Sequence, residues 1–424
     1  MSSYRRLGRV IPAGAVAAVL VLSGCSQGSS DDSAGSDSDG FYSVDDCTDP
    51  AAATAEITGD IKVGYSLPLS GPVAGPAAIS TAGYDARIKA YNDAGGLDGQ
   101  KIEVVYKDDA FAPDKAKSNA VDLIQNDEVD VVTTFGGGQV AAMADEQNAA
   151  CVPMLYPSAS NPLTYNIDDY PWTVQFLPES SREADFVLQA IQKKMGDEDY
   201  TLGLAVNQTA SGEINAESFN EVAEEAGVEI AAEVPATDPT AAATQLKEAG
   251  VDVVYHVGLT GTCAPLNGAM ARLGYEPKYV ILPANCANKA EWSAVGEAGA
   301  GAVVPLFLKN ANDPGAADDE GLQEYAEQTK DVASSTDAVT AAGWAMADML
   351  IATIEQAAES EDGLTRASLI EAARNLDYTS PMFLEGISWV STPDKLTGLS
   401  GFETGVWSVE AGAFVPEGGV IQVD

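Results

Sequence analysis

The stretch Ile61-Lys62-Val63-Gly64-Tyr65-Ser66-Leu67 has the short, mostly apolar composition of a buried strand. Similar apolar runs then alternate with helical patterns along the chain. We expect helices over 77–94, 113–125 and 140–150, and strands over 61–67, 102–106, 129–135 and 152–156. Strands that alternate with helices are typical of a parallel sheet covered by helices on both faces. The sequence therefore predicts a doubly wound α/β lobe.

The same alternation restarts after Thr173-Val174-Gln175-Phe176. The second set comprises helices over 181–195, 214–226, 240–249 and 265–273, and strands over 201–206, 228–233, 251–257 and 279–282. A second sheet with the same logic makes a second lobe. The predicted fold class is α/β, with two doubly wound parallel-sheet lobes.

Beyond Gly301 the pattern is mainly helical, with helices expected over 320–330, 337–358 and 366–375 and a hairpin strand over 402–409. No contiguous segment completes either sheet, which indicates a hinge where the chain crosses between the lobes several times. The expected boundaries are 59–177 and 307–388 for the first lobe, and 178–306 and 389–424 for the second.

The N-terminus has the pattern of a secretory signal. Arg5, Arg6 and Arg9 precede an apolar run over 10–22, which is too short to span a bilayer, and Leu22-Ser23-Gly24-Cys25 follows. Those four residues resemble a bacterial lipobox, whose cysteine is acylated. We expect a lipoprotein signal peptide over 1–24 and a lipidated flexible tether over 25–58. The protein would then be secreted and anchored by lipid to the outer face of the cytoplasmic membrane. The alternative is an ordinary signal peptide with an incidental cysteine.

The charge balance excludes one class of partner. The formal net charge is −42 at pH 7, and so acidic a surface repels nucleic acid while favouring solubility. We expect no nucleic-acid binding, and the charge alone does not identify a ligand.

Candidate binding residues lie in the loops that follow the first-lobe strands, where ligands bind in doubly wound sheets. The glycine run Gly136-Gly137-Gly138-Gln139 can direct backbone N–H groups at a ligand, beside the positive end of the next helix. Ser158-Ala159-Ser160 adds hydroxyl groups in the next loop. Together these residues predict a neutral, donor-rich cradle for a carboxylate or an amide. Alternatively, they form only turns and helix caps.

Catalysis is not indicated. The sole histidine, His256, lies within a predicted strand and is expected to be a core residue. The sequence has no Gly-x-Ser-x-Gly, Walker or Cys-x-x-Cys motif, and no cluster with metal-ligand spacing. We expect neither an enzyme nor a bound metal or cofactor.

Several motifs resemble a known family. Ser70-Gly71-Pro72, the segment from Tyr91 to Ile102, and Lys107-Asp108-Asp109 are similar to the opening of type I periplasmic binding proteins. The group in question is the branched-chain amino-acid and amide-type solute-binding proteins of ABC importers. Gly274-Tyr275 and Gly401-Phe402 extend the resemblance, which covers roughly 61–407.

The resemblance implies a clamp that closes around a small molecule. The first lobe would bind through Gly136 to Gln139 and Ser158 to Ser160, and the second through Ser211, Leu259, Thr260 and Asn285. Here the chain departs from the amino-acid binders, which often have a tyrosine at the position of Ser211 and a glutamate at that of Asn285. A buried ammonium without a carboxylate partner is costly. We therefore expect a ligand without a free α-amino group, such as an amide, a urea-like compound or a small organic acid, unless another acid such as Glu213 compensates.

Four cysteines remain after Cys25, an even number in an oxidising compartment. Cys263 and Cys286 each follow a second-lobe strand, whereas Cys47 and Cys151 each precede a first-lobe strand. We pair Cys263 with Cys286 and Cys47 with Cys151; the alternative is four buried free thiols.

The leading functional hypothesis is a monomeric receptor that captures a small polar ligand and presents it to an ABC permease in the membrane. The same clamp could instead serve as a ligand sensor for a signalling partner. An envelope enzyme is the third class, and the lack of a nucleophile–base pair argues against it.

Overall fold

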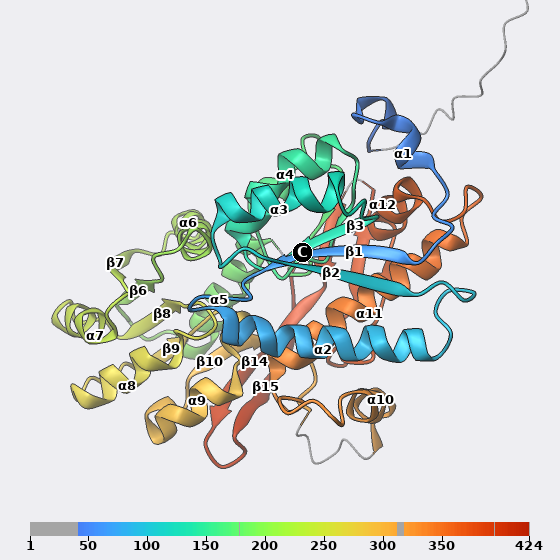
Figure 1. Cartoon of the computed structure of the whole chain (residues 1–424). Coiled ribbons are helices and arrows are strands. Elements are labelled where there is room, and N and C mark those ends of the chain that lie inside the picture. Colours follow the sequence, from blue (N-terminus) through green and yellow to red (C-terminus); the bar gives the residue numbers. More distant parts are fainter. Residues whose placement is uncertain (1–40, 178, 312–317, 394, 424) are drawn as a thin grey trace, which may run out of the picture. The chain divides into compact units, whose positions relative to one another are not determined.

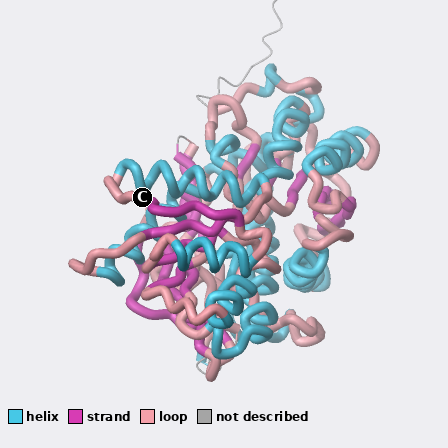
Figure 2. The backbone as a smooth tube through the Cα atoms, turned by 90° about the vertical axis from the view of Figure 1, so that its left-hand side faces the viewer, coloured by secondary structure: helices cyan, strands magenta, loops and turns pink. Residues whose placement is uncertain are grey.

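The computed structural model describes residues 41–424 except 178, 312–317, 394 and 424. The expected signal peptide, Cys25 and the first part of the expected tether lie outside the described residues. Figure 1 shows the arrangement of helices and strands, and Figure 2 shows strands with helices on both sides of them.

The first lobe is built on a five-stranded parallel sheet with the order β2-β1-β3-β4-β5. Its strands are β1 (Ile61–Leu67), β2 (Ile102–Asp108), β3 (Val131–Thr134), β4 (Met154–Leu155) and β5 (Thr173–Val174). Its helices include α2 (Ala74–Asp93), α3 (Pro113–Gln125) and α4 (Gly137–Ala149). Alternate residues of a strand point to opposite faces: Val63 and Tyr65 pack in the same cluster as α2, whereas Gly64 faces Leu123 of α3. Both faces are therefore buried, which explains the near-continuous apolar strands.

The second lobe is built on a seven-stranded sheet with the order β15-β14-β10-β9-β8-β6-β7. Its strands are β6 (Leu202–Val206), β7 (Ile230–Pro235), β8 (Val253–Val257), β9 (Tyr279–Ile281), β10 (Val303–Leu306), β14 (Gly401–Ser408) and β15 (Ala413–Gln422). Its helices include α5 (Ser180–Met195), α6 (Ala210–Glu225), α7 (Pro239–Glu248), α8 (Ala264–Arg272) and α9 (Lys289–Val295). The two-lobed α/β fold class is confirmed, although β14 and β15 pair antiparallel and make the second sheet mixed.

The C-terminal part returns to the first lobe before it ends in the second. It forms α10 (Glu320–Gln328), α11 (Ala338–Ala358) and α12 (Arg366–Arg374), then β11 (Asp377–Tyr378), β12 (Trp389–Thr392) and β13 (Lys395–Leu399). Strand β12 pairs antiparallel with both β11 and β13 in a third sheet, and Trp389 packs on Tyr156 with ring centroids 5.4 Å apart. Residues 389–399, which we expected to belong to the second lobe, therefore lie in a sheet separate from its seven-stranded sheet. An alternating pattern does not reveal which strand will be the partner.

Helix α11 is fixed to the first lobe by direct contact with α2, as Figure 1 shows. A Cβ added at Gly83 would lie 1.9 Å from the Thr340 carbonyl oxygen, and one at Gly343 would lie 1.9 Å from that of Ser80. Only glycine permits so close an approach of two helices. Helix α11 is as long and apolar as a membrane-spanning helix, but most of it is buried inside the protein.

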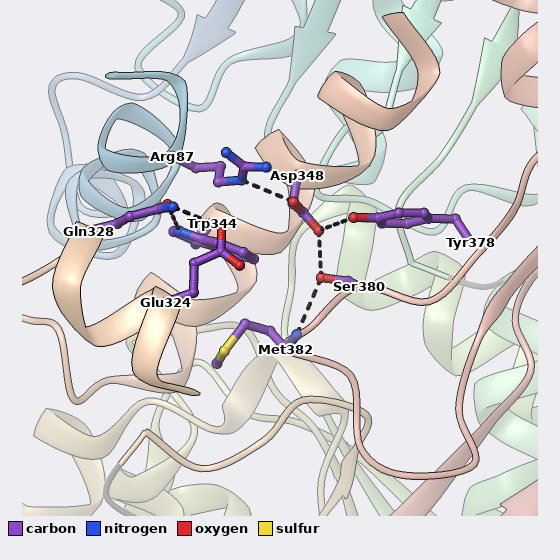
Figure 3. Close-up of polar contacts among 8 residues, drawn as sticks. All are labelled: Arg87, Glu324, Gln328, Trp344, Asp348, Tyr378, Ser380 and Met382. Carbon is purple, nitrogen blue, oxygen red and sulfur yellow. Dashed lines mark hydrogen bonds and ion pairs between the residues drawn. The ribbon is translucent and has the colours of Figure 1, made fainter. Parts of the chain in front are cut away.

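A buried ion pair strengthens this attachment. The Arg87 Nε of α2 lies 2.9 Å from Asp348 Oδ1 of α11, and Asp348 is almost fully buried. Tyr378 and Ser380 donate hydrogen bonds of 2.9 and 2.8 Å to Asp348 Oδ2 (Figure 3). Because the carboxylate has both a cationic partner and hydroxyl donors, its burial is compensated. The network ties the segment after α12 to the first lobe.

Residues 41–58, which we expected within the tether, are attached to the first lobe. They include the short helices η1 (Val44–Asp46) and α1 (Pro50–Thr54), and Cys47 forms a disulfide with Cys151. Tyr42 packs on Trp172 with ring centroids 4.9 Å apart, and its hydroxyl donates to Glu371 at 2.7 Å. The expectation of a flexible tether through residue 58 is therefore wrong for this part, because aromatic contacts and the disulfide hold it.

Candidate functional site

A cavity of about 110 Å³ lies where loops of both lobes meet. Each sheet has a point where the strand order reverses. In the first sheet the connections after the neighbouring strands β1 and β3 lead to opposite edges, and in the second sheet the connections after β6 and β8 do the same. Such a switch point leaves a crevice outside the strand ends. Nine of the expected binding residues line it, namely Gly136, Gly137, Ser158, Ala159, Ser160, Ser211, Leu259, Thr260 and Asn285.

The first-lobe wall is formed by the turn between β3 and α4. Gly136 has a positive φ of 107°. The residue before it, Phe135, forms an isolated parallel β-bridge with Ser158, and the Gly136 N–H donates a hydrogen bond of 3.1 Å to the Ser158 carbonyl. A Cβ at Gly136 would lie 2.9 Å from the ring of Phe111. Both the positive φ and the ring require glycine at this position.

Two expected binding residues lie outside this wall. Gln139 is buried, and its Oε1 is the atom that a Cβ at Gly136 would meet first, at 2.5 Å. Gly138 faces Ala210 at the start of α6, where an added Cβ would come within 3.1 Å of the alanine Cβ. These residues support the turn and do not line the cavity.

The second-lobe wall is formed by loops after β8 and β9. The Thr260 hydroxyl donates to the Asn285 carbonyl at 2.5 Å, which joins the two loops. Cys263 and Cys286 form the second expected disulfide. This disulfide packs against Gly258 at the end of β8, where an added Cβ would lie 3.0 Å from each sulfur. Asn285 Oδ1 is buried, and no described residue provides it with a hydrogen-bond partner. The wall is therefore rigid and retains unused hydrogen-bonding capacity.

A buried acid lies behind the same wall. Glu183 of α5 is 6% exposed, and its Oε1 accepts a hydrogen bond from the Ala284 N–H at 2.6 Å. Burial raises the pKa of Glu183 to about 7, although the Ala284 donor opposes the shift. His256 is also buried, on β8, and burial lowers its pKa to about 4, so the imidazole is neutral. Neither side chain lines the cavity, and His256 is a core residue as expected.

Most of the remaining wall was not foreseen from the sequence. It is mainly apolar and comes from the crossover segments, from α6 and from the first turn of α11: Phe176, Leu177, Ile214, Pro305, Leu306, Phe307, Leu308, Ala338, Val339 and Ala342. Strand β10 was itself not predicted, and apolar residues in a crossover resemble ordinary core residues. Tertiary structure alone brings them together.

No wall side chain among the described residues is Asp, Glu, Lys, Arg or His. The polar groups present are neutral, and they include Ser80, Ser158, Ser160, Ser211, Asn215, Thr260 and Asn285. Glu213, the acid that could have compensated for the missing glutamate, is exposed on α6 and lines a separate surface hollow. Nor do the described residues include three His, Cys, Asp or Glu side chains placed to hold a metal ion.

Comparisons with known proteins agree with this architecture. The family described as periplasmic binding protein matches residues 60–394. The Leu/Ile/Val-binding protein homolog 3 of Brucella melitensis is 24% identical over 75% of this chain and 85% of its own. A branched chain amino acid ABC transporter structure from Thermus thermophilus, with bound valine, superposes with a TM-score of 0.76 at 17% identity. It covers 86% of this chain and 97% of its own.

A solute binding protein of an ABC transporter from Rhodopseudomonas palustris BisB5, in complex with 3,4-dihydroxy benzoic acid, gives a TM-score of 0.70 at 20% identity. It covers 86% of this chain and 98% of its own. These structural similarities show the shared two-lobed fold.

Proposed function

Because the chain belongs to the periplasmic binding protein family, we propose that it is the extracytoplasmic solute receptor of an ABC importer. The family consists of solute-binding proteins and not of enzymes, as expected. Ligand would bind between the lobes and stabilise their closed arrangement, which requires a higher affinity for that state and no covalent step. The closed protein would then deliver the ligand to a membrane permease.

The ligand we propose has an apolar body, a neutral or anionic polar end, and no α-ammonium group. The observation that carries this proposal is that no described residue of the wall has a charged side chain. An ammonium transferred into such a site would lose its hydration without gaining a carboxylate partner. A carboxylate or an amide can instead accept hydrogen bonds from the serine hydroxyls of the wall and from backbone N–H groups near Gly137.

The size of the cavity limits the apolar body. Its volume of about 110 Å³ is somewhat smaller than an engineered apolar cavity of ~150 Å³ that accommodates benzene. A branched or cyclic body of roughly four to six carbon atoms is therefore appropriate. The two similar structures described above hold valine and 3,4-dihydroxy benzoic acid, so this fold accepts ligands with and without an ammonium group.

Matched pairs of ligands test the proposal. Valine and 3-methylbutanoate differ only by the α-ammonium, as do leucine and 4-methylpentanoate, and 3-methylbutanamide replaces the carboxylate by an amide. Thermal shift followed by calorimetry should show binding of the acid or amide and none of the amino acid. A larger shift with valine or leucine would contradict the ligand class while preserving the receptor role. Absence of binding by every small solute would contradict the receptor role itself.

We also propose a lipid anchor at Cys25, on the sequence pattern around it. Replacement Cys25→Ser removes the thiol that would be acylated, so the protein should move from the membrane fraction to the soluble extracellular fraction. Metabolic labelling with a clickable fatty acid should label the parent protein and not the variant. Equal labelling of both proteins would exclude acylation at this residue.

A further inference from the structure

The loop over 259–263, which we call the β8–α8 loop, carries two residues of the cavity wall, Leu259 and Thr260. It also reaches the opposite lobe, because a Cβ added at Gly261 would lie 3.4 Å from Cγ of Pro76 in α2. Gly261 has φ of 96°, a conformation that residues with a side chain rarely adopt. The position of this loop therefore affects both the shape of the cavity and the fit between the two lobes.

A single carboxylate holds the centre and the end of the β8–α8 loop. Glu291 Oε2 accepts a hydrogen bond from the Gly261 N–H at 3.0 Å, and Glu291 Oε1 accepts one from the Cys263 N–H at 2.6 Å. Two N–H donors directed at the two oxygens favour the ionised form of the acid. Hydrogen bonds to a carboxylate are stronger than those between neutral groups. Glu291 thus fastens the loop at two points.

The start of α8 requires an acceptor from another segment. The first N–H groups of a helix have no acceptor within that helix, and the N-cap residue of α8, Cys263, has no side-chain oxygen. Its sulfur forms the disulfide with Cys286. A negative charge near a helix N-terminus is also favoured by the helix dipole. Glu291 therefore supplies, from the neighbouring helix, the acceptor that an aspartate or serine would supply at the N-cap position.

Glu291 is itself held in place on α9. Its N–H donates to Asn288 Oδ1 at 3.1 Å, so it lies in the capped first turn of that helix. The next residue, Trp292, is fully buried and donates from Nε1 to the Cys286 carbonyl at 2.6 Å. Cys286 follows Asn285 in the other loop of the second-lobe wall. Helix α9 is therefore joined to one wall loop through Trp292 and to the other through Glu291.

Glu291 holds a part of the β8–α8 loop that lies between two other links. The disulfide ties the end of the loop to the neighbouring wall loop, and the Thr260 hydroxyl ties its start to the Asn285 carbonyl at 2.5 Å. Gly261 lies between these links, and its N–H is one of the two groups that Glu291 binds. Loss of Glu291 should therefore loosen the centre of the loop, while the disulfide keeps its end attached to the lobe.

We infer that Glu291 is a positioning residue that fixes the β8–α8 loop in its binding conformation and thereby raises the affinity for the ligand. Glu291 is not among the described residues that line the cavity, so it acts through Leu259 and Thr260. A loop that is ordered before binding avoids the entropy cost of being ordered by the ligand, and affinity rises accordingly. This inference rests on the proposed receptor function, but it also makes a prediction for the protein without ligand.

Two variants of Glu291 grade the loss of the contact. Glu291→Ala removes both acceptor oxygens, whereas Glu291→Gln preserves the size of the side chain and one oxygen but replaces the other by an amide nitrogen, which cannot accept. Glu291→Gln alone carries both measurements if the alanine variant does not fold. The matched control is Asp238→Ala, because Asp238 accepts from the Thr240 and Ala241 N–H groups at 2.9 and 3.1 Å at the start of α7, on the surface of the same lobe.

Hydrogen exchange and calorimetry are the two measurements. Without ligand, mass spectrometry should show exchange of the segment 259–263 accelerated on the order of tenfold in Glu291→Ala, and less in Glu291→Gln. Calorimetry uses 3-methylbutanoate or valine, whichever the parent protein binds. The affinity should fall on the order of tenfold in Glu291→Ala and less in Glu291→Gln. Asp238→Ala should keep the parent exchange rate of 259–263 and the parent affinity despite a lower melting temperature.

Two outcomes would overturn the role of Glu291. One is the parent exchange rate of 259–263 in both Glu291 variants, which would mean that the carboxylate does not hold the loop. The other is accelerated exchange with the parent affinity, which would mean that the order of the loop does not determine binding. A parent protein that binds no member of the ligand panel would contradict the receptor role instead, and the exchange rates alone would then decide whether Glu291 holds the loop.

Discussion

The Ser211 hydroxyl oxygen accepts a hydrogen bond of 3.0 Å from the Gly137 N–H, so that α6 of the second lobe caps α4 of the first. Both residues line the cavity. The contact occupies one of the backbone donors that the sequence assigned to the ligand. A free N–H at the start of α4 has no acceptor within its helix, and here the opposite lobe supplies it.

Replacement Ser211→Ala should expose this N–H to water. A neutral hydrogen bond contributes about 1 kcal/mol, so hydrogen exchange of the segment 136–138 should accelerate several-fold, as measured by mass spectrometry without ligand. The control is Ser118→Ala, because the Ser118 hydroxyl donates only to Asp114 within α3 and lies on the surface. Unchanged exchange in Ser211→Ala would show that the contact is not maintained in solution.

Replacement Asn285→Glu should change the ligand preference. It introduces an acid into a wall that has no charged side chain among the described residues, and the acid can pair with an ammonium. The variant should gain affinity for valine and lose affinity for 3-methylbutanoate, because a second carboxylate would repel the new one. Calorimetry with the two ligands checks this; Asn285→Gln preserves the amide and should retain the parent preference.

Glu183 should make stability fall as the pH rises. Its folded pKa of about 7 lies above the ordinary glutamate value of 4.5, so the folded state binds the proton more tightly than the unfolded state. The stabilisation is fully present below pH 4.5 and is lost as the pH rises to about 7, by about 3 kcal/mol in total. Glu183→Gln removes this titration. Urea unfolding at pH 5 and pH 7.5 should therefore show a smaller pH-dependent loss for the variant than for the parent, and identical losses would contradict the assignment.

Replacement Gly83→Ala should destabilise the first lobe by about 2–3 kcal/mol, since overpacking forces neighbouring backbone apart. The added Cβ would lie 1.9 Å from the Thr340 carbonyl oxygen. Gly75→Ala is the matched control in the same helix, because a Cβ there meets nothing within 4 Å. Chemical unfolding should show a loss for the first variant and a small gain for the second. Equal effects would mean that α2 and α11 are not in close contact.

The two disulfides should contribute unequally. The Cys47–Cys151 bridge closes a sequence separation of 104 residues and the Cys263–Cys286 bridge one of 23. Loop-closure entropy then predicts losses of about 5 and about 3 kcal/mol when each pair is replaced by serine. Non-reducing peptide mapping should find both bridges, and urea unfolding of the two double-serine variants compares their contributions. A free thiol at any of the four positions would contradict the pairing.

The sequence by itself determined the class of fold and the loops that carry the site. Apolar strands such as 61–67 and glycine turns such as Gly136 follow local rules of periodicity and backbone conformation, which do not depend on distant partners. The disulfide pairs followed from the strand ends at which their cysteines lie.

Tertiary structure alone decided which residues complete the cavity and which contacts join the lobes. Phe307 and Val339 line the cavity only because the chain returns through the crossovers, and the Lys289 ammonium contacts the Thr336 hydroxyl across a sequence separation of 47 residues. Strand β12 was not predicted from the sequence, and its pairing with β11 and β13 depends on non-local hydrogen bonds. The lack of charged side chains among the described wall residues is likewise a property of the assembled lobes, because no segment of the sequence shows which acids will face away from the cavity.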